Sequence, residues 1–303
     1  MGLFLNLLLG FMAFASESTP REAKALFQNY EFKRSLAAWM ELHQKSPGNW
    51  DYVKNVADLQ LLLEGRANAL ETLRGFLGQQ NKVLSPLQKQ EVLKKIIELS
   101  ELFLKEEAQT HYLQALSKAK LNEWNASLSP VTQAAALEPD NLKLLTLKHE
   151  IEKKTGLHDQ AYETLKNIRM IDPLSIKPME RLAEAHIFHG KYLEAKSLLE
   201  QSDRASLSNR GKLALAVSLL ESGDREEAQE LIEPMVQNKK MELSQHPVTL
   251  WMAYRLALED DPKSKETQMA LKTFLTSSSE TPRVLIDGWD PYRIGYYRSI
   301  LAK

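Results

Sequence analysis

Side chains that could do chemistry are sparse in this sequence, and the most suggestive are two histidines. His186 and His189 lie three residues apart in the stretch HIFH, so on a helix both rings would share one side and could hold a metal ion together. The sequence suggests no third ligand nearby, and we interpret both as structural histidines. Asp and Glu are frequent, but their spacing gives no pair the distinct environment that glycoside hydrolysis requires.

The short motifs that mark common catalytic and nucleotide sites are also missing. The chain has no phosphate-binding P-loop, no G-x-G-x-x-G, no G-x-S-x-G and no H-E-x-x-H. It has no cysteine, which excludes disulfides, thiolate metal sites and a cysteine nucleophile. We therefore predict a protein that is not an enzyme and that carries neither cofactor nor metal.

The overall charge favours no particular class of partner. The 303 residues include 39 Lys and Arg against 40 Asp and Glu, a formal net charge of -1, and 43% of them are hydrophobic. This composition is ordinary for a soluble protein with a substantial core. A chain with so little net charge produces no global field that would attract nucleic acid or an anionic bilayer. We expect no nucleic-acid partner and no stable membrane span.

The elements that carry these side chains are predicted to be helices. After Pro20, apolar residues recur at spacings of three and four, without a convincing run of alternating β-branched residues. The stretches GKYLEAKSLLE and GDREEAQELIE repeat one pattern, and a period near 34 residues is typical of a repeat unit. The recurring positions are held by Gly156, Gly190 and Gly223, by Ala161, Ala195 and Ala228, and by Pro139 and Pro173. The sequence therefore predicts an all-α fold of repeated helix pairs.

The copy at residues 176–206 shows why one such pair cannot stand alone. Gly190 supplies the conformational freedom that ends the first helix and turns the chain into the second. The small side chains of Ala183 and Ala195 allow the two helices to approach closely. A single hairpin cannot bury its apolar faces, so neighbouring hairpins must stack and share one core.

At these positions the chain resembles the tetratricopeptide repeat (TPR) family, best over residues 141–238. Helix pairs of that family carry a small residue late in the first helix and a glycine before the second. An aromatic, an alanine and a closing proline then follow. Earlier copies match less well, and Asn122 stands where the glycine is expected. The resemblance implies an α-α superhelical solenoid of antiparallel helix pairs with an atypical terminal cap.

Four parts are predicted along the chain. They are a signal peptide at 1–15, degenerate TPR-like helices at 20–105, TPR repeats at 107–238, and an atypical helical pair with a C-terminal cap at 239–303. Before the atypical pair we expect six or seven helix pairs, with 86–105 a poorly matching helix between two better groups. The cap aromatics are expected to cover the last open face, the alternative being a platform for sugar or peptide; they are Trp289, Tyr292, Tyr296 and Tyr297.

The first fifteen residues, MGLFLNLLLGFMAFA, have the features of a secretory signal peptide. An uncharged apolar run is followed by Ala13-Phe14-Ala15, a pattern that signal peptidase recognises, and cleavage is expected before Ser16. The run is too short to span a bilayer. No Lys or Arg precedes it, which departs from the usual signal peptide, and the alternative is a buried first helix in a cytoplasmic protein. We expect a periplasmic or secreted protein.

The TPR resemblance implies a non-catalytic scaffold that binds a protein or peptide along the groove formed by its first helices. The two best repeats place eight residues there, namely Lys177, Glu180, Glu184 and Ile187, then Arg210, Leu213, Val217 and Leu220. Because acids occupy two of these places, a clamp for a terminal carboxylate is not expected.

The predicted groove combines an apolar strip of Leu213, Val217 and Leu220 with flanking charges from Lys177 and Arg210. Such a surface suits an amphipathic helix or an extended segment. The alternative is that the chain's own helices fill the strip. Two other functions stay open, an envelope glycan-acting enzyme and a structural assembly subunit of an envelope complex, and the oligomeric state is open as well.

Overall fold

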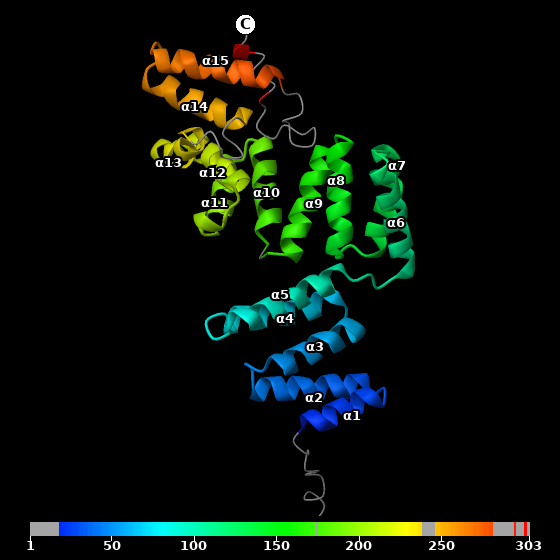
Figure 1. The fold of residues 1–303 in the computed structure, drawn as a ribbon. Helices are drawn as coiled ribbons and strands as arrows, with labels where there is room; N and C mark the ends of the chain where they lie inside the picture. Colours follow the sequence, from blue (N-terminus) through cyan, green and yellow to red (C-terminus); the bar gives the residue numbers. More distant parts are fainter. Residues whose placement is uncertain (1–17, 174, 238–245, 281–293, 295–299, 302–303) are drawn as a thin grey trace, which may run out of the picture. The chain divides into compact units, whose positions relative to one another are not determined.

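The computed structural model describes residues 18–173, 175–237, 246–280, 294 and 300–301. The predicted signal peptide and the four aromatics of the predicted cap lie outside these residues. The described residues form fifteen α helices and one 3₁₀ helix, with no strand among them (Figure 1). The all-α prediction is therefore confirmed. No described helix is long and apolar enough to cross a membrane.

The helices follow one another along the chain with short connections. In chain order they are α1 (Pro20–Gln28), α2 (Phe32–Lys45), α3 (Trp50–Leu63), α4 (Arg66–Gln80), α5 (Pro86–Glu101), α6 (Glu106–Lys120), α7 (Trp124–Leu137), α8 (Leu142–Lys154), α9 (His158–Ile171), α10 (Ile176–Phe188), α11 (Tyr192–Leu199), η1 (Arg204–Ser206), α12 (Asn209–Glu221), α13 (Arg225–Gln237), α14 (Pro247–Asp260) and α15 (Lys265–Glu280).

A left-handed residue marks the turn inside six of the helix pairs. Four of these residues are glycines, three of them the periodic glycines of the sequence, and the other two are not; the six are Tyr30, Gly65, Asn122, Gly156, Gly190 and Gly223, with φ between 63° and 98°. The turn at Gly190 shows why this position needs a positive φ. The Gly190 N–H donates to the Ile187 carbonyl at 2.9 Å and the Lys191 N–H to the His186 carbonyl at 2.8 Å. These bonds satisfy the last carbonyls of the first helix, and they require a positive φ.

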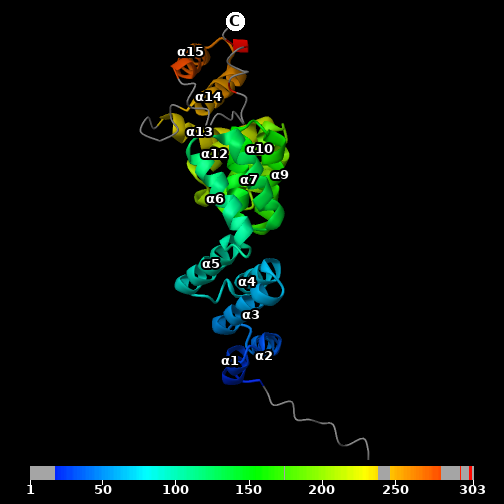
Figure 2. The ribbon, with the colours of Figure 1, turned by 90° about the vertical axis from the view of Figure 1, so that its right-hand side faces the viewer.

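The described chain thus contains six helix pairs up to α13, the single helix α5, and a further pair formed by α14 and α15. Contacts divide the chain into two compact units, residues 1–102 and residues 103–303. The N-terminal unit holds α1 to α5, in which each helix packs on the next (Figure 2). We call α1, α3, α6, α8, α10, α12 and α14 the first helices, because each opens a pair.

The single helix α5 is attached to the N-terminal unit by a buried arginine. Arg66, at the start of α4, is 1% exposed, and its Nε donates to the Leu99 carbonyl at 2.9 Å. A second N–H of the same guanidinium reaches the Leu102 carbonyl. A cation that binds the last carbonyls of a helix satisfies acceptors that have no partner inside the helix, and it also complements the helix dipole. Arg66 therefore stabilises the end of α5 in place of a second helix.

In the C-terminal unit, first helices of neighbouring pairs contact one another, as α10 contacts α12 and α12 contacts α14. The alanines that the sequence places at close helix crossings are fully enclosed, since Ala183, Ala195 and Ala228 are 0% exposed. They belong to one core cluster that runs through α10 to α15. Each pair thus completes the core of the next, as stacking of TPR-like hairpins requires.

Enlarging these alanines is expected to destabilise the C-terminal unit. Ala195→Leu or Ala228→Leu should each lower the free energy of unfolding by ~1 to 3 kcal/mol, because three extra carbons must enter a closed helix crossing. Urea denaturation followed by circular dichroism measures the effect. Leu193→Ala, at a position of α11 that is 68% exposed, is the control and should leave the midpoint nearly unchanged. Equal midpoints for all three variants would contradict the close crossing.

Candidate partner-binding groove

A groove of about 420 Å³ lies between the first helices α10 and α12. Its walls come from α10, from the connector that contains η1, and from the start of α12, and the lining residues are Ile176, Lys177, Glu180, Arg181, Ser206, Leu207, Ser208 and Arg210. Three residues that the sequence assigned to a groove, Lys177, Glu180 and Arg210, are therefore brought together here. The remaining assigned residues have other surroundings.

Glu180 uses its carboxylate to hold the beginning of α12. The Ser208 N–H donates to Oε1 and the Ser208 hydroxyl donates to Oε2, both at 2.7 Å. Ser208 is the N-cap of α12, and its Oγ accepts the Gly211 N–H at 3.1 Å. A carboxylate at this end of a helix meets unpaired N–H groups and the positive end of the helix dipole. Glu180 is thus engaged within the fold, although it forms part of the groove wall.

Gly211 is needed because the Glu180 carboxylate occupies the space beside it. A Cβ added to Gly211 would lie 2.2 Å from Glu180 Oε1 and 2.6 Å from its Cδ. The carboxylate cannot move aside without losing its bonds to Ser208. Nothing in the sequence pattern indicates this role, since Gly211 does not belong to the series of turn glycines.

Substitution of Gly211 tests this close contact. We expect Gly211→Ala to lower the free energy of unfolding by ~1 to 3 kcal/mol, through the clash itself or through lost bonds to a buried carboxylate. Thermal and urea denaturation would measure it. In a Glu180→Ala background, where nothing is left to clash, the same substitution should cost little. If it costs as much there as in wild type, the contact is not the cause.

Glu184 lies one turn further along α10 and forms the buried partner of Arg210. Its side chain is 0% exposed, and both of its oxygens accept N–H groups of the Arg210 guanidinium, whose side chain is 29% exposed. Two parallel hydrogen bonds of this kind fix the relative position of the two groups. Glu184 therefore acts from behind the groove, where it orients Arg210, and is not available to a partner.

The Glu184–Arg210 pair is one member of a series that links consecutive first helices. In each case a glutamate of one first helix pairs with an arginine of the next, namely Glu150 with Arg181, Glu184 with Arg210, and Glu221 with Arg255. We call this series the Glu–Arg ladder. It fixes the register between α8, α10, α12 and α14. The arginines do not recur at a constant interval, so the repeat period alone could not reveal the ladder.

The predicted apolar strip is wrong as a surface feature. Leu213, Val217 and Leu220 are 2%, 1% and 6% exposed and belong to the core cluster, as does Ile187. The physical reason is that α12 is surrounded, since it contacts α10, α11, α13 and α14. The apolar surface that remains in the groove is provided by the half-buried Ile176, while Leu207, which also lines the groove, is 4% exposed and belongs to the core.

Lys177 differs from the other charged residues of the groove because its charge is uncompensated. Arg181 pairs with Glu150 and Arg210 pairs with Glu184. Lys177 is exposed, and among the described residues it has neither an ion-pair nor a hydrogen-bond partner. In the part of the chain that the structure describes, the groove therefore combines the unpaired Lys177, two oriented guanidinium groups and the Glu180 carboxylate with a small apolar surface.

The two histidines of the HIFH stretch surround a tyrosine. The His186 Nδ1 and the Tyr162 hydroxyl are 3.2 Å apart, and the His189 and Tyr162 rings have centroids 4.7 Å apart. Burial lowers the pKa of His186, so its ring is neutral at pH 7. Within the described ranges, no three His, Asp or Glu side chains are grouped so that they could hold a metal ion.

Among comparisons with known proteins, only the comparison with solved structures gives matches. No family model and no curated protein matches the sequence. Among solved structures, the chain is similar to MamA (MSR-1), with 16% identity, a TM-score of 0.46, and 58% of this chain and 99% of that chain covered.

Two further solved structures also resemble the chain. PilW, described as a widely conserved type IV pilus biogenesis factor, has 12% identity and a TM-score of 0.45, covering 65% of this chain and 90% of that one. A tetratricopeptide repeat protein from Parabacteroides merdae has 10% identity and a TM-score of 0.42, covering 93% and 97%. The helix pairs described above define this chain as an α-helical repeat protein with a TPR-like solenoid fold.

Proposed function

We propose that the protein is a non-catalytic scaffold that binds a partner protein through the groove between α10 and α12. The observation that carries the proposal is the uncompensated charge of Lys177 at a groove whose other cations, Arg181 and Arg210, are held in place by the Glu–Arg ladder. Because these guanidinium groups are already oriented, they lose little conformational entropy when they bind a carboxylate. Ile176, which is half-buried, adds apolar area that a partner side chain would bury.

The partner segment that fits this surface is acidic and carries at least one apolar side chain. Charge attraction would steer and orient it, while burial against Ile176 would supply binding free energy. The Glu180 carboxylate is directed at the start of α12, where it accepts two hydrogen bonds from Ser208, so an acidic side chain of the partner would have to bind beside Lys177 and away from Glu180.

A charge reversal at Lys177 tests the proposal. After in-cell crosslinking and purification identify a stoichiometric partner, Lys177→Glu should weaken its binding at least tenfold and leave the melting temperature unchanged, since Lys177 is exposed. Lys272→Glu is the matched control, because it reverses an exposed lysine of the same unit on α15. Equal affinity of both variants would rule out the groove as the binding surface.

We further propose that the chain is exported to the bacterial cell envelope. The support is the apolar run of residues 3–12, followed by Ala13-Phe14-Ala15. Mass spectrometry of the native protein after cell fractionation should find a mature chain that begins at Ser16 in the periplasmic or secreted fraction. An intact first residue in the cytosolic fraction would refute export.

A further inference from the structure

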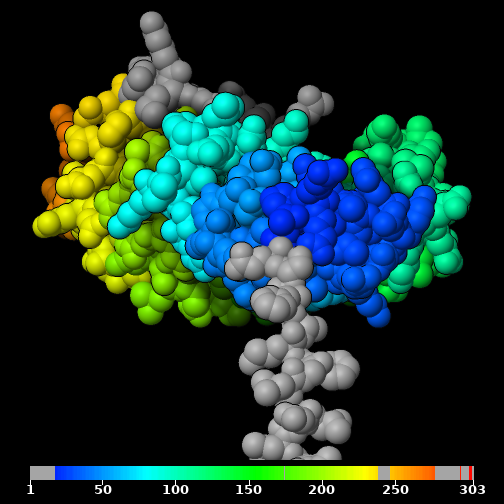
Figure 3. Space-filling model, turned by 90° about the horizontal axis from the view of Figure 1, so that it is seen from below, coloured from blue at the N-terminus to red at the C-terminus, as the bar shows by residue number. Residues whose placement is uncertain are grey.

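Exposed aromatic side chains gather at the turn between α1 and α2. Phe27 is 48% exposed and Tyr30 is 82% exposed. The Phe32 ring lies between them, with centroids 5.3 Å from Phe27 and 5.9 Å from Tyr30, in edge-to-face arrangements. We call these three residues the aromatic patch. In Figure 3, the blue side chains of α1 and α2 face the viewer.

Tyr30 has a backbone conformation that tyrosine rarely adopts. Its φ is 64°, and the five equivalent turns that also have a positive φ use glycine or asparagine. A bulky residue in this region is strained, and such strain is often retained at functional positions. Folding does not explain the choice of tyrosine, because most of its ring is exposed to solvent. The ring is therefore open to contact with a partner molecule.

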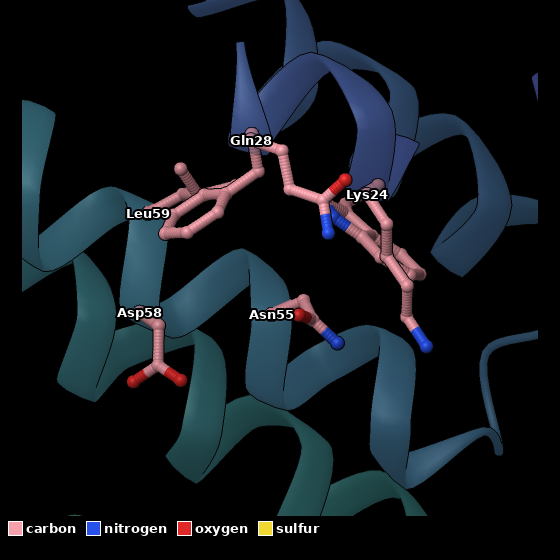
Figure 4. A pocket seen from close by; sticks show the side chains of 7 residues that line it. Lys24, Gln28, Asn55, Asp58 and Leu59 are labelled. Carbon is pink, nitrogen blue, oxygen red and sulfur yellow. The ribbon is translucent and has the colours of Figure 1, made fainter. Parts of the chain in front are cut away.

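The aromatic patch continues into a pocket of about 190 Å³ between α1 and α3. Phe27 belongs to both, and the other apolar walls are Trp39 and Leu59. Four polar residues complete the lining. Figure 4 shows Lys24 and Gln28 on the side of α1, and Asn55 and Asp58 on the side of α3.

Two of the polar residues that line the pocket have N–H groups available to a ligand. Lys24 and Gln28 have no hydrogen-bond or ion-pair partner among the described residues. Asp58, the only carboxylate of the lining, already pairs with Lys95 at 2.8 Å. A ligand for this pocket must therefore bring carbonyl or carboxylate oxygens for the free N–H groups, together with apolar surface for the rings.

We propose that the aromatic patch and its pocket bind an extended, proline-containing peptide segment with an acidic side chain. A polyproline II segment has no internal hydrogen bonds, so its carbonyls stay free to accept from Gln28 and Lys24. Its prolyl rings pack well on aromatic side chains, and its backbone is already ordered before binding. An acidic side chain beside the prolines matches the uncompensated charge of Lys24.

An amphipathic helix is a poorer ligand for this site. The carbonyls of a helix are bonded within the helix itself, so they would leave the Gln28 amide unpaired. This second site belongs to the N-terminal unit, and it does not depend on the groove between α10 and α12. A failure of one proposal would leave the other unaffected.

Fluorescence anisotropy with the full chain and labelled decapeptides tests the proposal. The probe contains eight prolines and two glutamates, and a matched peptide replaces the prolines by glycine and serine. We expect the proline peptide to bind at least tenfold more tightly than the matched one. Phe27→Ala and Tyr30→Gly should each weaken binding of the proline peptide at least fivefold, whereas Val83→Ala, at a residue that is 80% exposed on the α4–α5 connection, should not.

Two further readouts separate a binding role from a structural one. Tyr30→Gly removes the strained backbone conformation, so its melting temperature should stay equal or rise while binding falls. Lys24→Ala should weaken binding of the peptide that contains glutamates, but not binding of a version in which glutamines replace them. The proposal is overturned by absent saturable binding, by equal affinity for the glycine–serine peptide, by preference for a helical acidic peptide, or by a Val83→Ala effect as large as that of Phe27→Ala.

Discussion

Removal of the Arg210 side chain is expected to cost about 3 kcal/mol or more of the free energy of unfolding. Arg210→Ala leaves the Glu184 carboxylate, which is 0% exposed, without the guanidinium that it binds through two hydrogen bonds. Breaking a buried ion pair by removal of one partner typically costs ~3 to 5 kcal/mol, because a charge stays buried and uncompensated. Urea denaturation at pH 7 measures the loss.

Substitution of the other partner, Glu184, should be less destabilising. The difference between the two costs tests whether the buried charge is the cause. Glu184→Gln leaves a charged Arg210 whose side chain is 29% exposed and can reach water, so we expect a cost of about 1 to 2 kcal/mol. The double variant Arg210→Ala with Glu184→Gln should recover part of the stability lost in Arg210→Ala alone. Equal costs for the two single variants, without recovery in the double variant, would show that packing and not charge dominates.

The repeated architecture could be predicted from the sequence because it rests on local physical requirements. A turn with positive φ favours glycine, and a close helix crossing requires alanine. Gly156, Gly190 and Gly223 therefore reveal three of the six turns. The turns at Tyr30 and Asn122 have the same backbone conformation without glycine. The repeat pattern still locates the turn at Asn122, where asparagine stands in place of the expected glycine. It does not locate the turn at Tyr30, so the aromatic patch there remains hidden.

The groove was predicted in part, and the error has a clear origin. Counting from the turn glycines predicts the direction in which each groove side chain points. It does not predict which neighbouring helix covers that side chain. Lys177, Glu180 and Arg210 do line a groove, whereas Leu213 and Val217 face neighbouring helices. A helix with apolar residues on most of its faces signals enclosure and not an open surface. The partners of Glu180 and Glu184 depend on tertiary contacts, which no periodicity encodes.

Acidification between pH 6.5 and pH 4 is expected to destabilise the fold through buried neutral histidines. Burial lowers the pKa of His149 from 6.5 to about 4, an effect that the nearby Glu150 opposes. His149 is 1% exposed, and its Nδ1 lies 3.1 Å from the Ala161 carbonyl oxygen. Because a carbonyl oxygen can only accept, the Nδ1–H donates this hydrogen bond. His246, with a pKa also lowered to about 4 by burial, acts in the same direction.

Whether acid stabilises or destabilises the protein depends on whether the folded or the unfolded chain binds the proton at the higher pH. Above pH 6.5 the ring of His149 is neutral in both states, and its titration leaves the stability unchanged. Below pH 6.5 the His149 ring becomes protonated in the unfolded chain, whereas in the folded chain it stays neutral down to about pH 4. The free energy of unfolding therefore falls as the pH falls. At pH 5 this one residue accounts for a loss of about 2 kcal/mol.

A variant without the titrating ring isolates this contribution. His149→Gln keeps a donor for the Ala161 carbonyl but cannot become charged, so its stability relative to wild type should improve by about 2 kcal/mol between pH 7.5 and pH 5. Carboxylates that titrate in the same range are common to both proteins and cancel in the difference. Urea denaturation at the two pH values provides the measurement. Parallel pH profiles of the two proteins would mean that His149 is protonated in the fold as readily as in the unfolded chain.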